Sequence, residues 1–407
     1  MPTEIETLQS ASSDAGTRHT IHLGIDAVNI RQGGGLTHLS RLLQAADPAD
    51  AGISRVTLWT SRNTASVLPD YPWLTKCSAP WMNAALPWRI FGQQFWLPRE
   101  VRRTGCDVLF SPGSTLPLLR SVPAVTLSQN MLPFEPQEAV RFGKWNLMRL
   151  KMRMLRSSQR HSFERADGLI FLTQYAQTHI LAMLSRGPRH IALIPHGIEP
   201  RFFQAPRPQK PASEFSAGNP FRILYVSILM PYKHQCEVAR AAALLRADGF
   251  PVEVRFVGPP WGEYGRRFGA LIDTLDRERN FLLWSGAESF ESVHVYYQNS
   301  DLFVFASSCE NLPNILIEAM AAGLPIAAAN RGPMPETLGE AGIYFDPEQP
   351  SAIAEALRQL MLDVQLRARL ADSAYSKAQD YSWDRCARDT FRFIAKVARE
   401  STGGRSR

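Results

Sequence analysis

Residues Asp301 to Asn330, DLFVFASSCENLPNILIEAMAAGLPIAAAN, decide the fold of this chain. The stretch reads as a buried strand, a polar loop, a helix, a Gly-Leu-Pro turn and a second strand. Pro313 suits the first turn of the helix, and Gly323 suits its end. Free amides at the start of a helix, aided by the helix dipole, bind phosphate groups. The segment therefore predicts a strand, loop and helix unit with an anion site at the helix start.

Two carboxylates flank this predicted anion site. Glu310 lies in the loop before the helix, and Glu318 lies about five residues into it, or ~7–8 Å along the axis. One carboxylate can therefore reach each end of a ligand joined by a pyrophosphate. On the pattern alone, Glu310 is equally an exposed loop residue and Glu318 an ordinary residue of the helix surface.

Short apolar runs that end in Gly, Pro, Ser or Asn alternate with helical stretches along the chain. Such alternation is typical of parallel sheets covered by helices on both faces. We expect an α/β protein with two doubly wound, Rossmann-like domains facing a deep cleft, where ligands bind beyond the carboxyl ends of the strands. Strands are expected within residues 19–27, 106–114, 123–130, 168–173, 190–197, 221–227, 252–260, 281–287, 301–308 and 324–330.

The domain boundaries are predicted from composition. Residues 204–220 are rich in Pro, Ser and Ala and form the best linker candidate. We expect a disordered leader at 1–18, a first domain at 19–205 and a second domain at 206–380. A C-terminal helix at 381–407 is long enough to return across the linker to the first domain.

Bulk properties exclude several protein classes. The 407 residues, 45% of them hydrophobic and 20% charged, are typical of a soluble globular protein, and no run approaches ~18 apolar residues. The polar leader is not a secretion signal, so a cytoplasmic location is expected. Five scattered cysteines predict neither disulfides nor a structural metal. The net charge of +7 indicates anionic partners without naming them.

The Glu310-x7-Glu318 segment resembles the signature of the GT-B glycosyltransferases that retain anomeric configuration, specifically glycosyltransferase family 4. The resemblance continues through residues 318–347, EAMAAGLPIAAANRGPMPETLGEAGIYFDP. It implies a nucleoside diphosphate sugar as co-substrate, with Glu318 on the ribose hydroxyls. It places the sugar on Glu310 and the loop after it, which is here Asn311, Leu312 and Pro313. It places the diphosphate on the helix amides, which are here those of Asn314 and Ile315. The family's usual Gly-Phe-Gly in this loop is replaced by Asn311-Leu312-Pro313.

A second match to the family lies at the first strand of the second domain, LYVSILMPYKHQ. Ser227 and Lys233 resemble the ends of the family's Gly-x5-Lys loop, in which the lysine neutralises the departing diphosphate. A fixed cation is most effective in a cleft that excludes water. The resemblance thus assigns catalytic positions to Glu310 and Lys233. Neither Glu310 nor Glu318 is expected to act as a proton-transfer base. Ile228 stands nearest the place where many relatives carry an arginine.

Three further loops receive roles from the resemblance. The glycine loop would bring Gly34 and Gly35 close to the phosphates and the acceptor, which needs backbone without side chains in the way. Asn130 stands in the loop where many relatives carry a His-Asp pair, and its amide can bind a hydroxyl but cannot act as a base. Gly286 would lie near the nucleotide base. Residues 194–198 are read as a structural turn, and Glu336 is left outside the site.

A basic amphipathic helix is predicted within residues 141–165, RFGKWNLMRLKMRMLRSSQRHSFER. Such a helix suits an anionic membrane surface. It is equally explained by an apolar stripe that faces the core and a solvated basic back. Trp81, Trp88, Phe91 and Phe95 add support for an acceptor on the lipid side. Nucleic-acid binding is disfavoured, because no known nucleic-acid module is present.

Together these features predict a glycosyltransferase with an N-terminal acceptor domain and a C-terminal donor domain. It would move mannose or another hexose from a GDP- or UDP-sugar to a saccharide or lipid-linked acceptor in cell-surface polysaccharide or glycolipid synthesis. No metal is expected, since no Asp-x-Asp motif of metal-dependent transferases occurs. The alternatives are a catalytically degenerate protein that only binds nucleotide sugars, and a sugar-nucleotide epimerase or phosphorylase.

Overall fold

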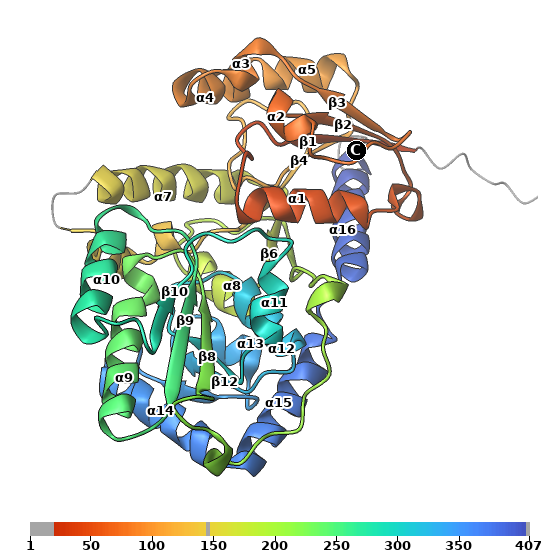
Figure 1. Cartoon of the computed structure of the whole chain (residues 1–407). Helices are drawn as coiled ribbons and strands as arrows, with labels where there is room; N and C mark the ends of the chain where they lie inside the picture. Colours follow the sequence, from red (N-terminus) through yellow and green to blue (C-terminus); the bar gives the residue numbers. More distant parts are fainter. Residues whose placement is uncertain (1–19, 144–146, 404–407) are drawn as a thin grey trace, which may run out of the picture.

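The computed structural model describes residues 20–143 and 147–403 and contains two parallel sheets, one above the other (Figure 1). The first sheet has seven strands in the order β3-β2-β1-β4-β5-β6-β7. The chain reverses its direction of travel across the sheet beside β1, as in doubly wound folds. The strands are β1 (Ile21–Asp26), β2 (Ile53–Trp59), β3 (Leu74–Cys77), β4 (Val108–Ser111), β5 (Ala124–Leu127), β6 (Gly168–Phe171) and β7 (His190–Leu193).

The second sheet has six strands in the order β10-β9-β8-β11-β12-β13, which is the same arrangement with one strand fewer. Four strands near the sheet centres, β1, β4, β11 and β12, are buried along their whole length, as expected of continuous apolar runs covered on both faces. The strands are β8 (Phe221–Val226), β9 (Val252–Val257), β10 (Leu282–Trp284), β11 (Leu302–Phe305), β12 (Ile326–Ala329) and β13 (Ile343–Phe345).

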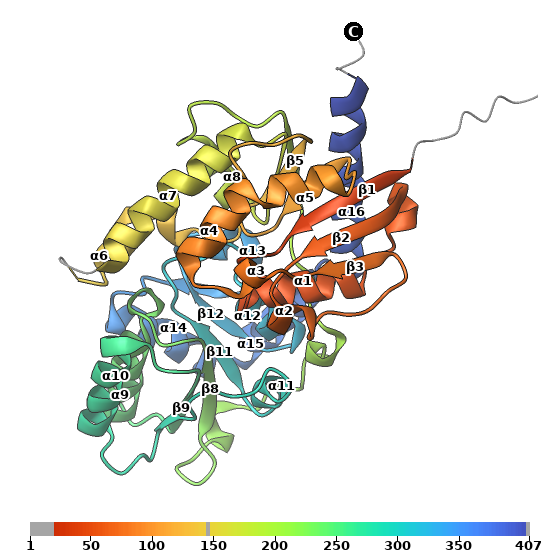
Figure 2. The same cartoon turned by 90° about the horizontal axis from the view of Figure 1, so that it is seen from above.

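Helices cover both sheets (Figures 1 and 2). Those of the first half are α1 (Gly34–Gln44), α2 (Arg62–Ala65), α3 (Pro80–Asn83), α4 (Leu86–Phe95), α5 (Leu97–Arg103), α6 (Pro136–Val140), α7 (Leu147–Arg165) and α8 (Gln174–Leu181). Those that follow are α9 (Gln235–Ala247), α10 (Gly262–Leu275), α11 (Val293–Gln298), α12 (Asn314–Ala321), α13 (Met334–Leu338), α14 (Pro350–Leu362), α15 (Val364–Ala378) and α16 (Trp383–Gly403). Short 3-10 turns lie at η1 (Pro48–Ala51), η2 (Leu132–Phe134), η3 (Pro200–Phe202), η4 (Ala212–Glu214) and η5 (Pro231–Lys233).

The C-terminal helix α16 packs on the first sheet and not on the second. It contacts η1, α1, β4 and β5, and Arg392 pairs with Asp50 at 3.0 Å. Figure 1 shows α16 rising from the second half beside α1. The chain therefore passes between the halves twice, once at residues 194–204 and once before Trp383.

The expectation of two doubly wound, Rossmann-like sheets is confirmed. The apolar runs singled out in the sequence each contain a strand, and β2, β3 and β13 are additional to them. Pro313 lies immediately before α12 and not in its first turn, because the helix begins at Asn314. The leader at 1–18, as well as Lys144 and Trp145 of the basic segment, lies outside the described residues.

Candidate functional site

The start of α12 offers one free amide. The Asn314 N–H donates to Leu312 O at 2.9 Å, so the structure removes one of the two amides expected to bind phosphate. The Ile315 N–H has no hydrogen-bond partner among residues 20–143 and 147–403. Because an amide at a helix start carries part of the positive end of the dipole, Ile315 keeps the expected capacity to bind an anion.

Lys233 and Glu310 are brought together beside this amide. The Lys233 ammonium donates to Glu310 Oε1, and the lysine is almost fully buried. The Tyr225 hydroxyl donates to the Lys233 carbonyl, and the ammonium lies 5.5 Å from the centre of the Phe305 ring. These contacts fix a cation at the end of the η5 turn. A buried charge pair of this kind is stable only while each partner keeps the other.

Glu318 is the second carboxylate of the site, and it is buried. The Tyr297 hydroxyl donates to Glu318 Oε2 at 2.8 Å. Burial raises the pKa of Glu318 to about 7, against the opposing effects of the Tyr297 hydrogen bond and the Arg201 charge. The carboxyl group thus titrates near neutral pH and has room for more hydrogen-bond donors.

Glu310, Ile315 and Glu318 line one cavity of about 410 Å³ between the two halves of the molecule. Lys233 is not on its wall and is joined to the site by its ion pair with Glu310. Six residues expected at the site lie on its wall, one from the first half and five from the second: Gly34, Glu310, Leu312, Asn314, Ile315 and Glu318. The rest of the wall comes from α1, the connection after β7, the end of β8, the 288–293 segment and the first residue of α16: Thr37, Gly197, Ile198, Glu199, Phe202, Val226, Glu288, Ser289, Phe290, Val293 and Trp383.

Other expected site residues of the second half hold the backbone around the cavity. Asn311 Nδ2 donates to Ser128 O at 2.9 Å across the halves, which leaves its buried Oδ1 without a partner. The Ser227 hydroxyl donates to Ile228 O at 3.1 Å. Gly286 O accepts from Gly258 N at 2.6 Å, and Gly286 has a φ of 74°, a conformation that favours glycine. Pro313 precedes α12, so it shapes the loop.

The first half contributes less to the cavity than the sequence suggested. A Cβ at Gly35 would lie 3.2 Å from Gln129 Oε1, whereas Gly34 has open space around it. Asn130 is exposed, and its Oδ1 accepts from Leu132 N at 3.0 Å within its own loop. Gly34 is therefore the residue of this loop that meets the cavity.

Three stacked rings lie beside the cavity, and no pattern in the sequence predicted them. The His38 and His196 rings lie 4.4 Å apart, and Trp383 stacks on His196 at 5.6 Å. Burial lowers the pKa of His196 to about 4, so its ring is neutral at pH 7. Asn314 Nδ2 lies 3.4 Å from His196 Nδ1, and the buried His196 Nε2 has no partner. The stack joins α1, the turn at residues 194–198 and α16 at the place where the chain passes between the halves.

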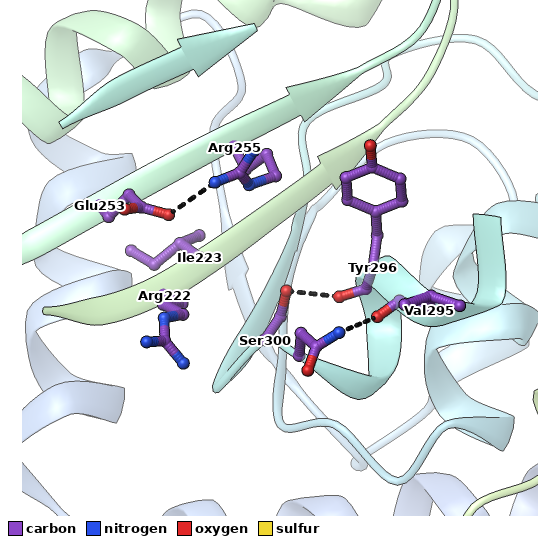
Figure 3. Close-up of a pocket in the computed structure, with 8 residues that line it drawn as sticks. Arg222, Ile223, Glu253, Arg255, Val295, Tyr296 and Ser300 are labelled. Atoms are coloured by element: carbon purple, nitrogen blue, oxygen red, sulfur yellow. Dashed lines mark hydrogen bonds and ion pairs between the residues drawn. The ribbon is translucent and has the colours of Figure 1, made fainter. Parts of the chain in front are cut away.

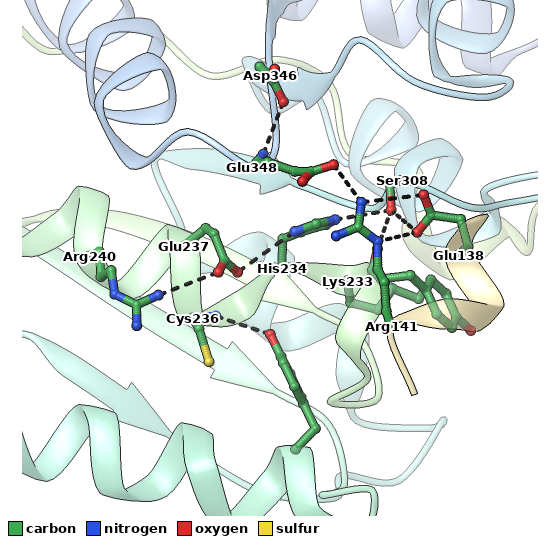
Figure 4. Close-up of polar contacts among 12 residues, drawn as sticks. Glu138, Arg141, Lys233, His234, Cys236, Glu237, Arg240, Ser308, Asp346 and Glu348 are labelled. Atoms are coloured by element: carbon green, nitrogen blue, oxygen red, sulfur yellow. Dashed lines mark hydrogen bonds and ion pairs between the residues drawn. The ribbon is translucent and has the colours of Figure 1, made fainter. Parts of the chain in front are cut away.

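A polar network near Lys233 joins the two halves of the molecule (Figure 4). The Ser308 hydroxyl donates to Glu138 Oε2 at 2.6 Å, and Arg141 pairs with both Glu138 and Glu348, at 2.7 and 2.5 Å. His234 Nε2 lies 3.0 Å from the Ser308 hydroxyl, and burial lowers the pKa of this histidine to about 4. The network packs α6 of the first half against the second half.

Glu336, which the sequence left outside the site, makes a further contact between the halves. Its two carboxylate oxygens accept from Gln174 N and Tyr175 N, each at 2.7 Å. Both amides lie in the first turn of α8, where a carboxylate is favoured by the helix dipole.

A separate hollow of about 480 Å³ lies at the amino-terminal ends of β8 and β9 (Figure 3). Arg222, Glu253, Arg255, Tyr296 and Ser300 line it, and Arg255 pairs with Glu253 at 3.3 Å. It contains none of the residues expected at the site. In the described part of the chain, no cluster of three or more His, Cys, Asp or Glu side chains could hold a metal ion. Within the same residues, no helix is long and apolar enough to cross a membrane.

Comparison with known proteins defines the class. Residues 206–377 match the family model described as Glycosyl transferases group 1. The chain superposes on sucrose-phosphate synthase from Thermosynechococcus elongatus with a TM-score of 0.72, at 18% identity, over 94% of this chain and 100% of that one. It also superposes on HepE of Anabaena, solved with UDP-glucose, with a TM-score of 0.64, at 18% identity, over 94% and 100% of the two chains. The fold is therefore GT-B, and the match supports a group 1 glycosyltransferase.

A curated relative is similar over part of its length. The O-antigen chain mannosyltransferase B of Escherichia coli is 26% identical over 171 residues, which are 41% of this chain and 44% of the relative. The chain spans about half the length of the curated relatives it matches. These similarities support sugar transfer as the activity.

Proposed function

We propose that this protein is a retaining glycosyltransferase of family 4 that moves a hexose from a nucleoside diphosphate sugar to a saccharide or lipid-linked acceptor. The observation that carries the proposal is the cavity between the halves. Its wall combines Glu310, the partner of the buried Lys233, with Ile315 and its free amide and with the under-bonded Glu318 carboxylate. The HepE complex with UDP-glucose supports a UDP-hexose as co-substrate, and the E. coli mannosyltransferase supports mannose as the sugar. A GDP-hexose is the other donor that we propose.

In this proposal each group acts on one part of the donor. Lys233 and the Ile315 amide stabilise the charge that develops on the diphosphate as the bond from sugar C1 to oxygen breaks. Glu310 holds sugar hydroxyls, and Glu318 accepts from the ribose. The acceptor hydroxyl attacks C1 from the same face, and its proton leaves with the diphosphate. Ser227, Asn311, Pro313 and Gly286 shape the walls.

We assign the acceptor to the first half, residues 19–205, and the donor to residues 206–380, with 381–407 returning to the first half. Peripheral attachment to an anionic membrane is part of this proposal. Large apolar side chains are exposed on α4 and α7, among them Trp88, 60% exposed, and Leu147, 82% exposed. Both helices lie on the same side of the molecule, away from α16 (Figures 1 and 2). An apolar stripe that faces the core does not account for these residues, although Met152 and Phe163 of α7 are buried.

The test measures release of UDP or GDP from a panel of UDP- and GDP-hexoses, with octyl glycosides as acceptors. We expect Glu310→Gln and Lys233→Ala to lower the rate by roughly 100-fold or more. Glu263→Gln on the exposed surface of α10 is the matched control and should keep the wild-type rate. Thermal melting of each variant checks that it is folded. NMR of the product linkage should show the anomeric configuration of the donor.

Three outcomes would contradict the proposal. Full transfer by Glu310→Gln would show that the site is elsewhere. Nucleotide sugars that raise the melting temperature of the wild type without any release of nucleotide would favour a binding protein, an alternative supported by Ile228 in place of an arginine. Conversion of the nucleotide sugar without free nucleotide would favour an epimerase.

A further inference from the structure

A chain of four polar side chains starts at the carboxyl edge of the first sheet. Gln93 Nε2 donates to Oδ2 of Asp26, the last residue of β1, at 2.5 Å. Asn29 Nδ2 donates to Gln93 Oε1 at 3.3 Å, and Arg89 donates to Asn29 Oδ1 at 3.1 Å. Asp26 and Gln93 are buried, whereas Arg89 is half-buried. The chain therefore runs from the core to the surface and ends on a guanidinium.

The direction of these hydrogen bonds fixes the guanidinium. An ionised carboxyl group only accepts hydrogen bonds, so Asp26 must face the amino group of Gln93. The oxygen of the Gln93 amide then points toward Asn29. Asn29 donates to that oxygen and presents its own oxygen to Arg89. The fold thus holds the Arg89 cation in one place, although Arg89 has no carboxylate within 4.0 Å among the described residues.

A second guanidinium lies in the same region of the first half. Arg31 follows Asn29 by two residues, and it donates to Met82 O of α3 at 2.5 Å. Partial burial and the charge of Arg31 both lower the pKa of Arg89. No carboxylate of the described residues pairs with Arg31, and the buried Nε of Arg89 has no hydrogen-bond partner. Two adjacent cations without a counter-charge repel each other, and a bound anion removes that cost.

One arginine is near the cavity in the chain, and the other belongs to α4, a helix with an exposed apolar face. Gly34, on the cavity wall, follows Arg31 by three residues, so their Cα atoms lie within ~11 Å. Arg89 belongs to α4, whose exposed apolar side chains include Trp88 and Phe91. A ligand held by the arginines would therefore be near the part of the cavity wall that Gly34 forms and near an apolar surface.

We propose that Arg31 and Arg89 bind a phosphate group of the acceptor and so select anionic acceptors. This inference rests on the proposed function, which it deepens by naming the acceptor class. The phosphate is not consumed: the bond from sugar C1 to the diphosphate breaks, a bond from C1 to the acceptor hydroxyl forms, and the nucleoside diphosphate leaves. Guanidinium groups suit this task because they bind phosphate through two parallel hydrogen bonds. The source is a lipid headgroup or a soluble sugar phosphate.

The first experiment titrates inorganic phosphate into full-length protein saturated with UDP or GDP, whichever binds, so that the donor phosphate site is filled. Calorimetry should show a saturable phosphate site in the wild type. We expect Arg89→Gln and Arg31→Gln each to weaken it at least fivefold with nucleotide affinity unchanged. Arg102→Gln on the exposed surface of α5 is the matched control. Because Arg31 is exposed, Arg31→Gln tests the site even if Arg89→Gln does not fold.

The second experiment separates the two phosphate sources by sedimentation with vesicles of phosphatidylinositol in phosphatidylcholine. Loss of sedimentation in Arg89→Gln assigns a lipid phosphate, and unchanged sedimentation with weakened phosphate binding assigns a soluble one. The inference is overturned if the nucleotide-bound wild type has no saturable phosphate site, or if both variants bind phosphate like the wild type. Failure of the proposed function is distinct, since it appears as an absence of nucleotide binding in the same titrations.

Discussion

Each half of the molecule buries a carboxylate near the carboxyl edge of its sheet, Asp26 in the first and Glu318 in the second. Burial raises the pKa of Asp26 to about 6 and that of Glu318 to about 7. Asp26 accepts from Gln93, from the Ser111 hydroxyl at 3.3 Å and from Val28 N at 3.3 Å. Glu318 accepts only from Tyr297 among the described residues.

The remaining hydrogen-bond acceptor capacity distinguishes a structural carboxylate from one that can bind a ligand. The oxygens of Asp26 are satisfied by the protein, so this group can only position its neighbours. Glu318 keeps acceptor capacity and lines a cavity, so a ligand can supply what the protein does not. A raised pKa alone does not distinguish the two residues.

The largest expected effect is on nucleotide affinity. Glu318→Gln should weaken binding of UDP or GDP by roughly 10- to 100-fold, since a hydrogen bond to a charged group is worth about 1.5–3 kcal/mol. Asp26→Asn should change nucleotide affinity by less than about twofold, because Asp26 does not line the cavity. Calorimetry on the two variants measures both. Equal losses would show that the two carboxylates do not differ in the way proposed.

A smaller effect is expected in the pH dependence. The pKa of folded Glu318, about 7, exceeds its ordinary value of 4.5, so the folded state binds more protons between these values. The stability that this group contributes is fully present below pH 4.5 and is lost as pH rises through 7. The whole change is on the order of 3 kcal/mol. For Asp26 the corresponding loss lies between pH 3.8 and about 6.

Denaturant unfolding of the protein without ligand from pH 4 to pH 8 measures this dependence. Glu318→Gln should remove the loss of unfolding free energy between pH 6 and pH 8. Asp26→Asn should remove only its own share of the loss of unfolding free energy below pH 6. Bound nucleotide should remove this loss of stability above pH 6, because ribose hydroxyls that donate to the ionised carboxylate lower the pKa of Glu318. A wild-type profile that is flat between pH 6 and pH 8 would contradict the raised pKa of Glu318.

The sequence predicted the second half better than the first. In residues 301–330 a strand, a loop and a helix follow one another directly, so Glu310, Ile315 and Glu318 are placed by local geometry alone. Lys233 is 77 residues from Glu310. The family resemblance placed Lys233 at the site, but its ion pair with Glu310 was not predicted from the sequence.

The first half could not be predicted to the same depth because its contacts are distant in sequence. His38, His196 and Trp383 come from three segments, and no local pattern relates them. The side chain of Asn130 caps its own loop, a competition that a motif match does not reveal. The chain of polar side chains from Asp26 to Arg89 spans 63 residues. No local sequence pattern relates its members, so only the fold shows that they are in contact.

The smallest expected effect is a loss of nucleotide affinity when the contact of Glu336 with α8, which joins the two halves, is removed. Glu336→Ala removes two hydrogen bonds to the first turn of α8, at an exposed position worth roughly 0.5–1 kcal/mol. Since Gly34 and Thr37 of the first half line the cavity, we expect nucleotide affinity to fall about two- to fivefold. Glu340→Ala, which removes an exposed carboxylate nearby, is the control. Small-angle scattering should show a larger radius of gyration for Glu336→Ala without ligand. Unchanged affinity and radius would mean that the Ser308–Glu138 and Arg141–Glu348 contacts hold the halves together without Glu336.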